Sequence, residues 1–185
     1  MFEKITLAIN LIASIFTIAA TIIAVITLMT WKKQQLLSSK MDLILDAEDH
    51  HLLLIGSYIE AFSFFFNIHK ISFDVKDKPK EIQNQAVEII DRERHKINMD
   101  KNALYSSNYQ MYIFRLQRMG LISDVEECLD TNHLFNFFSL YIDKLKKRDY
   151  SSIEDNEKFQ RQFVTELFEL KEKGGNIFKS IRQRL

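Results

Sequence analysis

The stretch that decides the architecture is residues 5–30, ITLAINLIASIFTIAATIIAVITLMT, which runs for 26 residues without a charged side chain. A helix rises about 1.5 Å per residue, and about 20 apolar residues cross the hydrocarbon core of a bilayer. The stretch is therefore long enough to span a membrane with some tilt. It predicts a transmembrane helix, and we place residues 1–33 in an N-terminal anchor with short flanks.

Two other interpretations of this stretch fit its length and flanks less well. A secretory signal peptide has an apolar core of about 7 to 15 residues followed by a cleavage site of small residues. Here the core is longer and runs directly into Met29, Thr30 and Trp31. A buried core helix of a soluble protein would need a large surrounding domain, and only 155 residues follow. We therefore expect an uncleaved membrane anchor.

Small and polar side chains recur within the stretch at intervals of 4, 3, 4, 3, 4 and 3 residues. This 3.5-residue repeat places them on one slowly turning face of a helix, and such faces pack against other membrane helices. Asn10 matters most, because lipid offers its amide no hydrogen-bond partner. The pattern predicts self-association, or association with a partner membrane protein, through a packing seam formed by Thr6, Asn10, Ala13, Thr17, Ala20, Ala24 and Thr27.

The flanks of the stretch predict its orientation. Glu3 and Lys4 precede it and balance each other, whereas Trp31, Lys32 and Lys33 follow it as a membrane-interface group. Lysine and arginine are enriched on the cytoplasmic side of membrane spans. We therefore expect a single-pass topology in a cell membrane, most simply a prokaryotic inner membrane, with the N-terminus outside and the remaining chain in the cytoplasm.

The composition of the rest of the chain is neutral and favours helices. The sequence has 25 basic and 25 acidic residues, so no basic excess indicates nucleic-acid binding. One proline and four glycines leave few turns for a many-stranded sandwich or barrel. The single cysteine, Cys128, suits a reducing compartment. We expect an all-α fold, with one N-terminal transmembrane helix followed by a cytoplasmic bundle of about five helices.

Apolar periodicity divides the cytoplasmic domain, residues 34–185, into a stalk at residues 34–49, a bundle at 50–173 and a C-terminal tail at 174–185. Within the bundle, the same periodicity predicts helices over residues 50–69, 79–98, 102–119, 123–148 and 151–173.

Local signals predict where these helices begin and end. Residues 71–80 form the clearest loop, beginning with a short extended piece, and Pro79 suits the first turn of the next helix. Ser123 followed by Glu126 has the spacing of a capping box, which predicts a helix start. The adjacent glycines at 174–175 predict the end of the last long helix.

The helix predicted at residues 50–69 is apolar enough to raise the alternative of a second membrane span. Glu60 near its centre would cost about 3 kcal/mol in lipid. A crossing would also place Lys76, Lys78 and Lys80 outside. We therefore prefer a buried core helix.

Seven of the 15 phenylalanines fall in two runs, at residues 62–66 and 135–138. Neighbouring helix positions point about 100° apart, so each run is buried on more than one side or leaves phenylalanine exposed. A core of two central helices is the simpler interpretation. The alternative is an apolar surface that docks on the membrane or on a second subunit.

Side chains that could bind a metal or support catalysis are few. Asp46, His50 and His51 come closest to a metal-ligand set, but a metal needs three or four converging ligands. Acidic residues here are typical of a helix junction. The glutamates before Cys128 would raise the pKa of its thiol. The sequence contains no phosphate-binding glycine loop, paired zinc motif or nucleophile elbow. We therefore expect no cofactor and rank a metal-dependent enzyme third.

The layout resembles in outline small prokaryotic proteins with an N-terminal span and a helical cytoplasmic domain, some of which act in stress or phage defence. We expect a single-pass, membrane-anchored interaction or sensor protein that oligomerises through its span and binds a partner through its helical domain. The main alternative is a membrane-active effector whose spans assemble into a pore or lesion. Asn10, Ser14, Thr17 and Thr21 would then line the polar path. Basic residues at 144–148 and 171–184 complement helix C-termini or contact anionic lipid.

Overall fold

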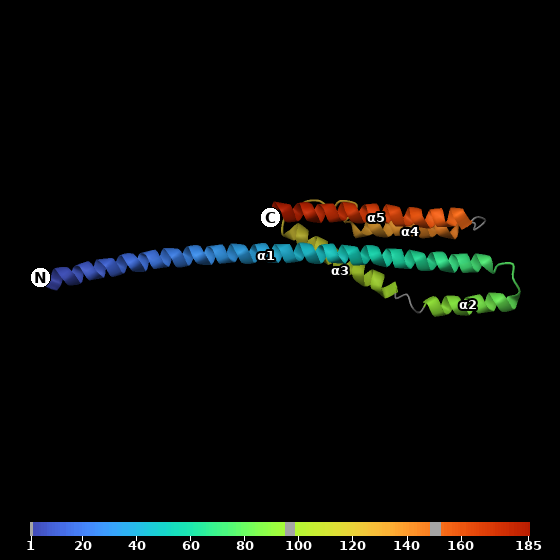
Figure 1. Ribbon diagram of the computed structural model, residues 1–185, viewed down its shortest axis with the longest axis horizontal. Helices are drawn as coiled ribbons and strands as arrows, with labels where there is room; N and C mark the ends of the chain where they lie inside the picture. Colours follow the sequence, from blue (N-terminus) through green and yellow to red (C-terminus); the bar gives the residue numbers. More distant parts are fainter. Residues whose placement is uncertain (1, 95–98, 149–152) are drawn as a thin grey trace. The chain divides into compact units, whose positions relative to one another are not determined.

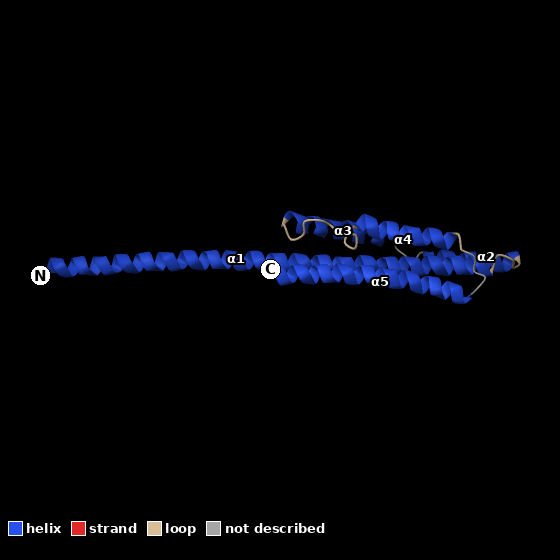
Figure 2. Ribbon diagram, turned by 90° about the horizontal axis from the view of Figure 1, so that it is seen from above, coloured by secondary structure: helices blue, strands red, loops and turns tan. Residues whose placement is uncertain are grey.

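The computed structural model describes residues 2–94, 99–148 and 153–185, and it describes the side chains of residues 12–92, 94, 101–148 and 154–185 (Figure 1). The described residues are 88% helical and contain no strand (Figure 2). This confirms the predicted all-α fold. The helices are α1 (Phe2–Asp74), α2 (Lys80–Arg94), α3 (Met99–Arg118), α4 (Thr131–Lys146) and α5 (Ile153–Arg184).

The chain divides into two compact units, Met1–Asp42 and Leu43–Leu185, and α1 contributes to both. Its 73 residues are helical without a break, so the junction predicted around residues 46–50 is wrong. The reason is a buried stripe that passes through those residues at 3- and 4-residue spacing, which is the repeat of a continuous helix face. The stripe consists of Ile44, Ala47, His51, Leu54, Tyr58 and Ala61.

Two predicted features of the loops are also wrong. Helix α1 continues to Asp74, so no extended piece begins at residue 71, and Phe73 packs against the core. The helix expected from Ser123 starts at Thr131 instead, where the Asp130 side chain accepts a hydrogen bond from the Asn132 amide at 3.0 Å. The residues before it form turns and bury four apolar side chains, Leu121, Ile122, Cys128 and Leu129, because tertiary burial there outweighs the local capping signal.

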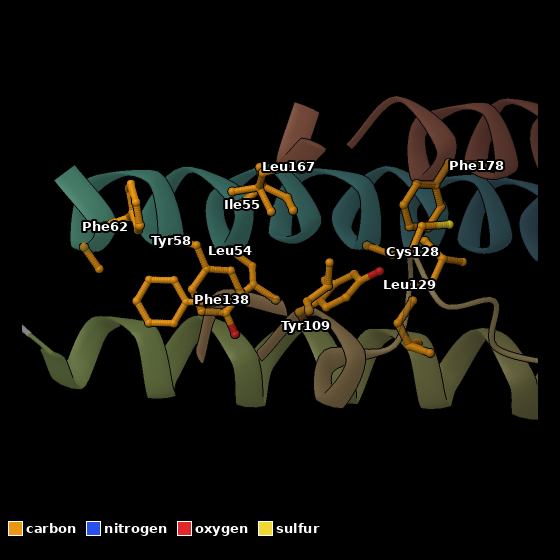
Figure 3. Close-up of a cluster of buried hydrophobic side chains, with 14 of the residues drawn as sticks. Leu54, Ile55, Tyr58, Phe62, Tyr109, Cys128, Leu129, Phe138, Leu167 and Phe178 are labelled. Atoms are coloured by element: carbon orange, nitrogen blue, oxygen red, sulfur yellow. The ribbon is translucent and has the colours of Figure 1, made fainter. Parts of the chain in front are cut away.

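The second unit is a bundle around residues 43–74 of α1. Helix α4 runs parallel to this segment, whereas α3 and α5 run antiparallel to it (Figures 1 and 2). Phe62 of α1 lies at the centre of this bundle. Its ring stacks on Phe163 of α5 with 3.9 Å between ring centroids, and its centroid lies 6.2 Å from that of Tyr141 of α4. The buried cluster continues along α1 (Figure 3), where the Tyr58 ring stacks on Phe138 with 4.9 Å between the ring centroids.

The two phenylalanine runs divide between core and surface. Phe62, Phe66 and Phe138 are buried in the core. Phe135 is 55% exposed, so the second run also contributes to the surface. Glu60 is exposed on α1, and the opposite face of this segment is buried within the bundle. The segment is therefore an amphipathic core helix.

Candidate functional site

The first candidate site is the apolar surface of α1 in the unit Met1–Asp42. All described side chains from residue 12 to residue 39 are exposed, and the large apolar ones from Ile12 to Met29 are each 50–71% exposed. Burying one such side chain is worth about 1.5–3 kcal/mol. The free-energy cost of leaving all ten in water would therefore exceed the about 5–15 kcal/mol that stabilises a typical domain. This surface needs a non-aqueous environment or a partner.

Helix α1 is long and apolar enough to cross a membrane, with a mean hydropathy of 2.4 in its most apolar window. Its polar side chains are compatible with lipid, because four threonine hydroxyls donate to the carbonyl four residues earlier. Thr17 and Thr21 do so at 2.9 and 2.8 Å, and Thr27 and Thr30 at 2.8 and 2.9 Å. A hydroxyl bonded in this way needs no further partner in lipid.

The packing seam forms one face of this helix. Its described members, from Ala13 to Thr27, are all exposed and lie within about 80° of Thr17, since consecutive positions turn by about 100°. Ile15, Ile22 and Ile26 lie on the opposite face, about 140–180° from Thr17. Thr6 and Asn10 belong to α1, but their side chains fall outside the described part of the structure. The membrane-interface group, Trp31, Lys32 and Lys33, follows directly and is exposed.

The candidate metal ligands do not converge. The His50 ring nitrogen Nδ1 lies 2.9 Å from the backbone carbonyl of Asp46, and the ring packs against Tyr112. His51 points away from His50, into the core. Among the residues that the structure describes, no three His, Cys, Asp or Glu side chains form a group that could hold a metal ion.

His51 is instead a polar centre inside the bundle. Its Nε2 lies 3.1 Å from the carbonyl of Cys128, which fixes Nε2 as the protonated nitrogen, and its ring lies between Tyr109 and Phe178. Burial lowers the pKa of His51 from 6.5 to about 4, although the Cys128 carbonyl and Glu48 favour the charged form. The side chain is therefore neutral at physiological pH.

The sequence predicted that the last long helix ends at the glycine pair, but α5 continues through it to Arg184. The packing of Gly174 explains the difference. A Cβ atom at Gly174 would lie 2.5 Å from Cε1 of His51, so α5 can approach α1 only with glycine there. The same approach lets Arg182 pair with Glu48, with Nη2 3.4 Å from Oε1 and a second contact from Nη1. Glycine here serves helix packing. Sequence reasoning missed the ion pair because its partners are 134 positions apart.

Cys128 is buried on the turn segment before α4. Burial raises the pKa of its thiol, and Glu126 raises it further. The sequence indicated a raised pKa from the glutamates alone, whereas burial is the larger cause. A protonated, buried thiol of this kind is a poor nucleophile.

A groove lies between α3 and α4 in the second unit. It holds a cavity of about 410 Å³ lined by Tyr58, Ser106, Ser107 and Phe135, among others. Phe135 is 55% and Phe114 59% exposed, and a smaller cavity beside Phe114 shares Gln110 with the first. We call this surface the α3–α4 groove. Its lining combines aromatic rings with uncharged polar groups, which suits a protein segment better than an ion.

No protein-family model, curated protein or solved structure shows significant similarity to this chain.

Proposed function

We propose that this chain is a single-pass membrane protein that is anchored by α1, associates through its packing seam and binds a protein partner through the unit Leu43–Leu185. The observation that carries this proposal is the exposure of the apolar side chains from Ile12 to Met29. The free-energy cost of exposing that surface to water exceeds the stability of a typical domain. Lipid accommodates it, and the internally bonded threonines support that environment.

The orientation that we propose has the N-terminus outside and Leu43–Leu185 in the cytoplasm, most simply at a prokaryotic inner membrane. The support is the membrane-interface group at the C-terminal side of the span. The buried, unpaired Cys128 agrees with a reducing compartment. A reporter that is active only in the cytoplasm should work when fused after Leu185. Activity of a periplasmic reporter at that position would reverse the orientation.

Association through the packing seam follows from the small side chains along one helix face. Such side chains allow close backbone approach, and each interhelical hydrogen bond in a membrane adds on the order of 0.6–2 kcal/mol. We expect Thr17→Leu with Ala24→Leu to reduce the signal of a reporter for membrane-helix association. The matched control, Ile15→Leu with Ile22→Leu, changes the opposite face and should leave the signal unchanged. Equal signals from both variants would contradict a role for the seam.

The partner-binding surface that we propose is the α3–α4 groove, because Phe114 and Phe135 remain exposed there. A photo-crosslinking residue at Phe135 should capture a protein partner or a second copy in intact membranes. The same residue at the exposed Lys158 of α5 provides the control. Equal crosslinking at both positions would indicate no specific surface.

The rival hypothesis of a pore-forming effector needs polar side chains that face water within the span. The hydroxyls of Thr17 and Thr21 are already hydrogen-bonded to the helix backbone, which supports a packing role instead. High expression in cells loaded with a membrane-potential dye separates the two hypotheses. We expect the potential to be maintained, and prompt depolarisation would favour the effector.

A further inference from the structure

A pocket of about 400 Å³ lies in the second unit, where α1 and α4 both end. Four cationic side chains line it: Lys76, Lys146, Lys147 and Arg148. They come from two segments far apart in the sequence, which the parallel course of α1 and α4 brings to the same end of the bundle (Figure 1). We call this site the basic pocket.

Cationic side chains are common at helix C-termini, where they balance the negative end of the helix dipole. The four positive charges of the basic pocket are therefore compared with the negative charge of the two helix ends. Each C-terminus contributes about half a negative charge, which gives about one for α1 and α4 together. Asp143 offsets one more through an exposed ion pair with Lys146 at 3.4 Å. Asp74 and Asp77 are not part of the lining, which contains no carboxylate among the described residues. About two positive charges therefore remain, more than the helix ends require.

Arg148 is held in place at the edge of this pocket. Its Nε donates to Oδ1 of Asn156 at 3.1 Å, and its Nη2 donates to the backbone carbonyl of Asp155 at 2.6 Å. The guanidinium carbon also lies 4.7 Å from the centre of the Phe159 ring. A guanidinium has five N–H donors, so these two bonds leave three for another acceptor. A fixed guanidinium loses little entropy when it binds a phosphate oxygen.

We propose that the basic pocket binds a phosphate-bearing ligand with at least two negative charges. The lysines supply the electrostatic attraction, and Arg148 supplies oriented donors. Ser72, His69 and Phe73 complete the lining, so a hydroxyl and two rings lie beside the charged part. The volume is within the range of pockets that hold small-molecule ligands. A soluble phosphate compound and a phospholipid headgroup share this chemistry, and the proposal does not depend on the membrane anchor.

The test is calorimetric titration of the full chain, in uncharged detergent micelles, with inorganic pyrophosphate. We expect Lys76→Gln with Lys147→Gln to weaken binding at least tenfold, because each lysine contact with an ionised oxygen is worth roughly a factor of ten. The control, Lys173→Gln with Lys179→Gln, removes the same charge from exposed positions on α5 and should bind as the native chain does. All four lysines are exposed, so both double variants should fold.

A second titration replaces pyrophosphate with short-chain phosphatidic acid, whose phosphomonoester can carry two negative charges, and short-chain phosphatidylcholine serves as its blank. Loss of pyrophosphate binding in the pocket variant identifies a soluble ligand as the source. Loss of phosphatidic acid binding alone identifies a lipid headgroup. The proposal is overturned if the native chain binds neither probe at millimolar concentration, or if both double variants weaken binding equally.

Discussion

Replacing Gly174 by alanine should destabilise the second unit, although alanine is ordinarily the better helix former by about 1 kcal/mol. The added Cβ would lie 2.5 Å from Cε1 and 3.1 Å from Nδ1 of His51, well inside ordinary contact. The ring cannot retreat easily, because Tyr109 and Phe178 flank it and its Nε2 is bonded to the Cys128 carbonyl. Overpacking costs about 1–3 kcal/mol, and disruption of a buried hydrogen bond adds about 1–3. The expected net loss, after the gain of about 1 kcal/mol in helix propensity, is about 1–5 kcal/mol.

Gly175 provides the matched control, because a Cβ atom there meets nothing within 4 Å. Gly175→Ala should therefore stabilise the protein by about 0.5–1 kcal/mol. The assay is thermal unfolding of the full chain in detergent, followed by near-ultraviolet circular dichroism of the tyrosines, all of which lie after residue 42. The two variants should differ in Tm by about 5–20 °C for a domain of this size. A Gly174→Ala variant as stable as Gly175→Ala would refute the close packing of α5 on His51.

Three further predictions concern the same core. The lowered pKa of His51 means that the unfolded chain binds more protons between pH 6.5 and about 4, so the free energy of unfolding should fall by about 3 kcal/mol as the pH drops through that window; a His51→Gln variant with the same slope would contradict this. Tyr109→Phe should raise stability by up to about 1–2 kcal/mol, because the buried hydroxyl has no hydrogen-bond partner among the described residues, and a loss of stability on calorimetry would contradict it. Glu48→Gln should cost about 1–2 kcal/mol, since its pair with Arg182 is mostly shielded from water, and a double-mutant cycle with Arg182→Met should give a coupling of similar size rather than none.

The sequence predicted those features that depend on local pattern. The length of the apolar stretch predicted the first helix, and the apolar character of residues 50–69 predicted a core helix there, which contributes Leu54, Tyr58 and Phe62 to the core. The helix boundaries were less predictable, because tertiary contacts decided them. The stripe through His51 carries α1 across an apparent junction, and the contact of Gly174 with His51 carries α5 past a glycine pair.

The candidate sites likewise divide into one that lies within a single helix and others that form between helices. The packing seam is a repeat within one helix, so the sequence alone could define it. The pair of Glu48 with Arg182 and the basic pocket join residues from different helices. Each basic residue at 144–148 was visible in the sequence, but its convergence with Lys76 required the parallel course of α1 and α4. Single-helix periodicity carries no information on that pairing.

The central claim, that α1 lies in lipid with its packing seam against another helix, is tested most directly by nitroxide scanning of residues 15–27. The full chain, carrying Cys128→Ala and one introduced cysteine at a time, would be labelled and reconstituted in liposomes. The collision rate of each nitroxide label with oxygen then reports its exposure to lipid, and its collision rate with a nickel chelate reports its exposure to water. We predict that oxygen access exceeds nickel access throughout, and that oxygen access is lower at Thr17 and Ala24 than at Ile15 and Ile22. Higher nickel access along the whole stretch would contradict the membrane span, and equal oxygen access on both faces would contradict the seam.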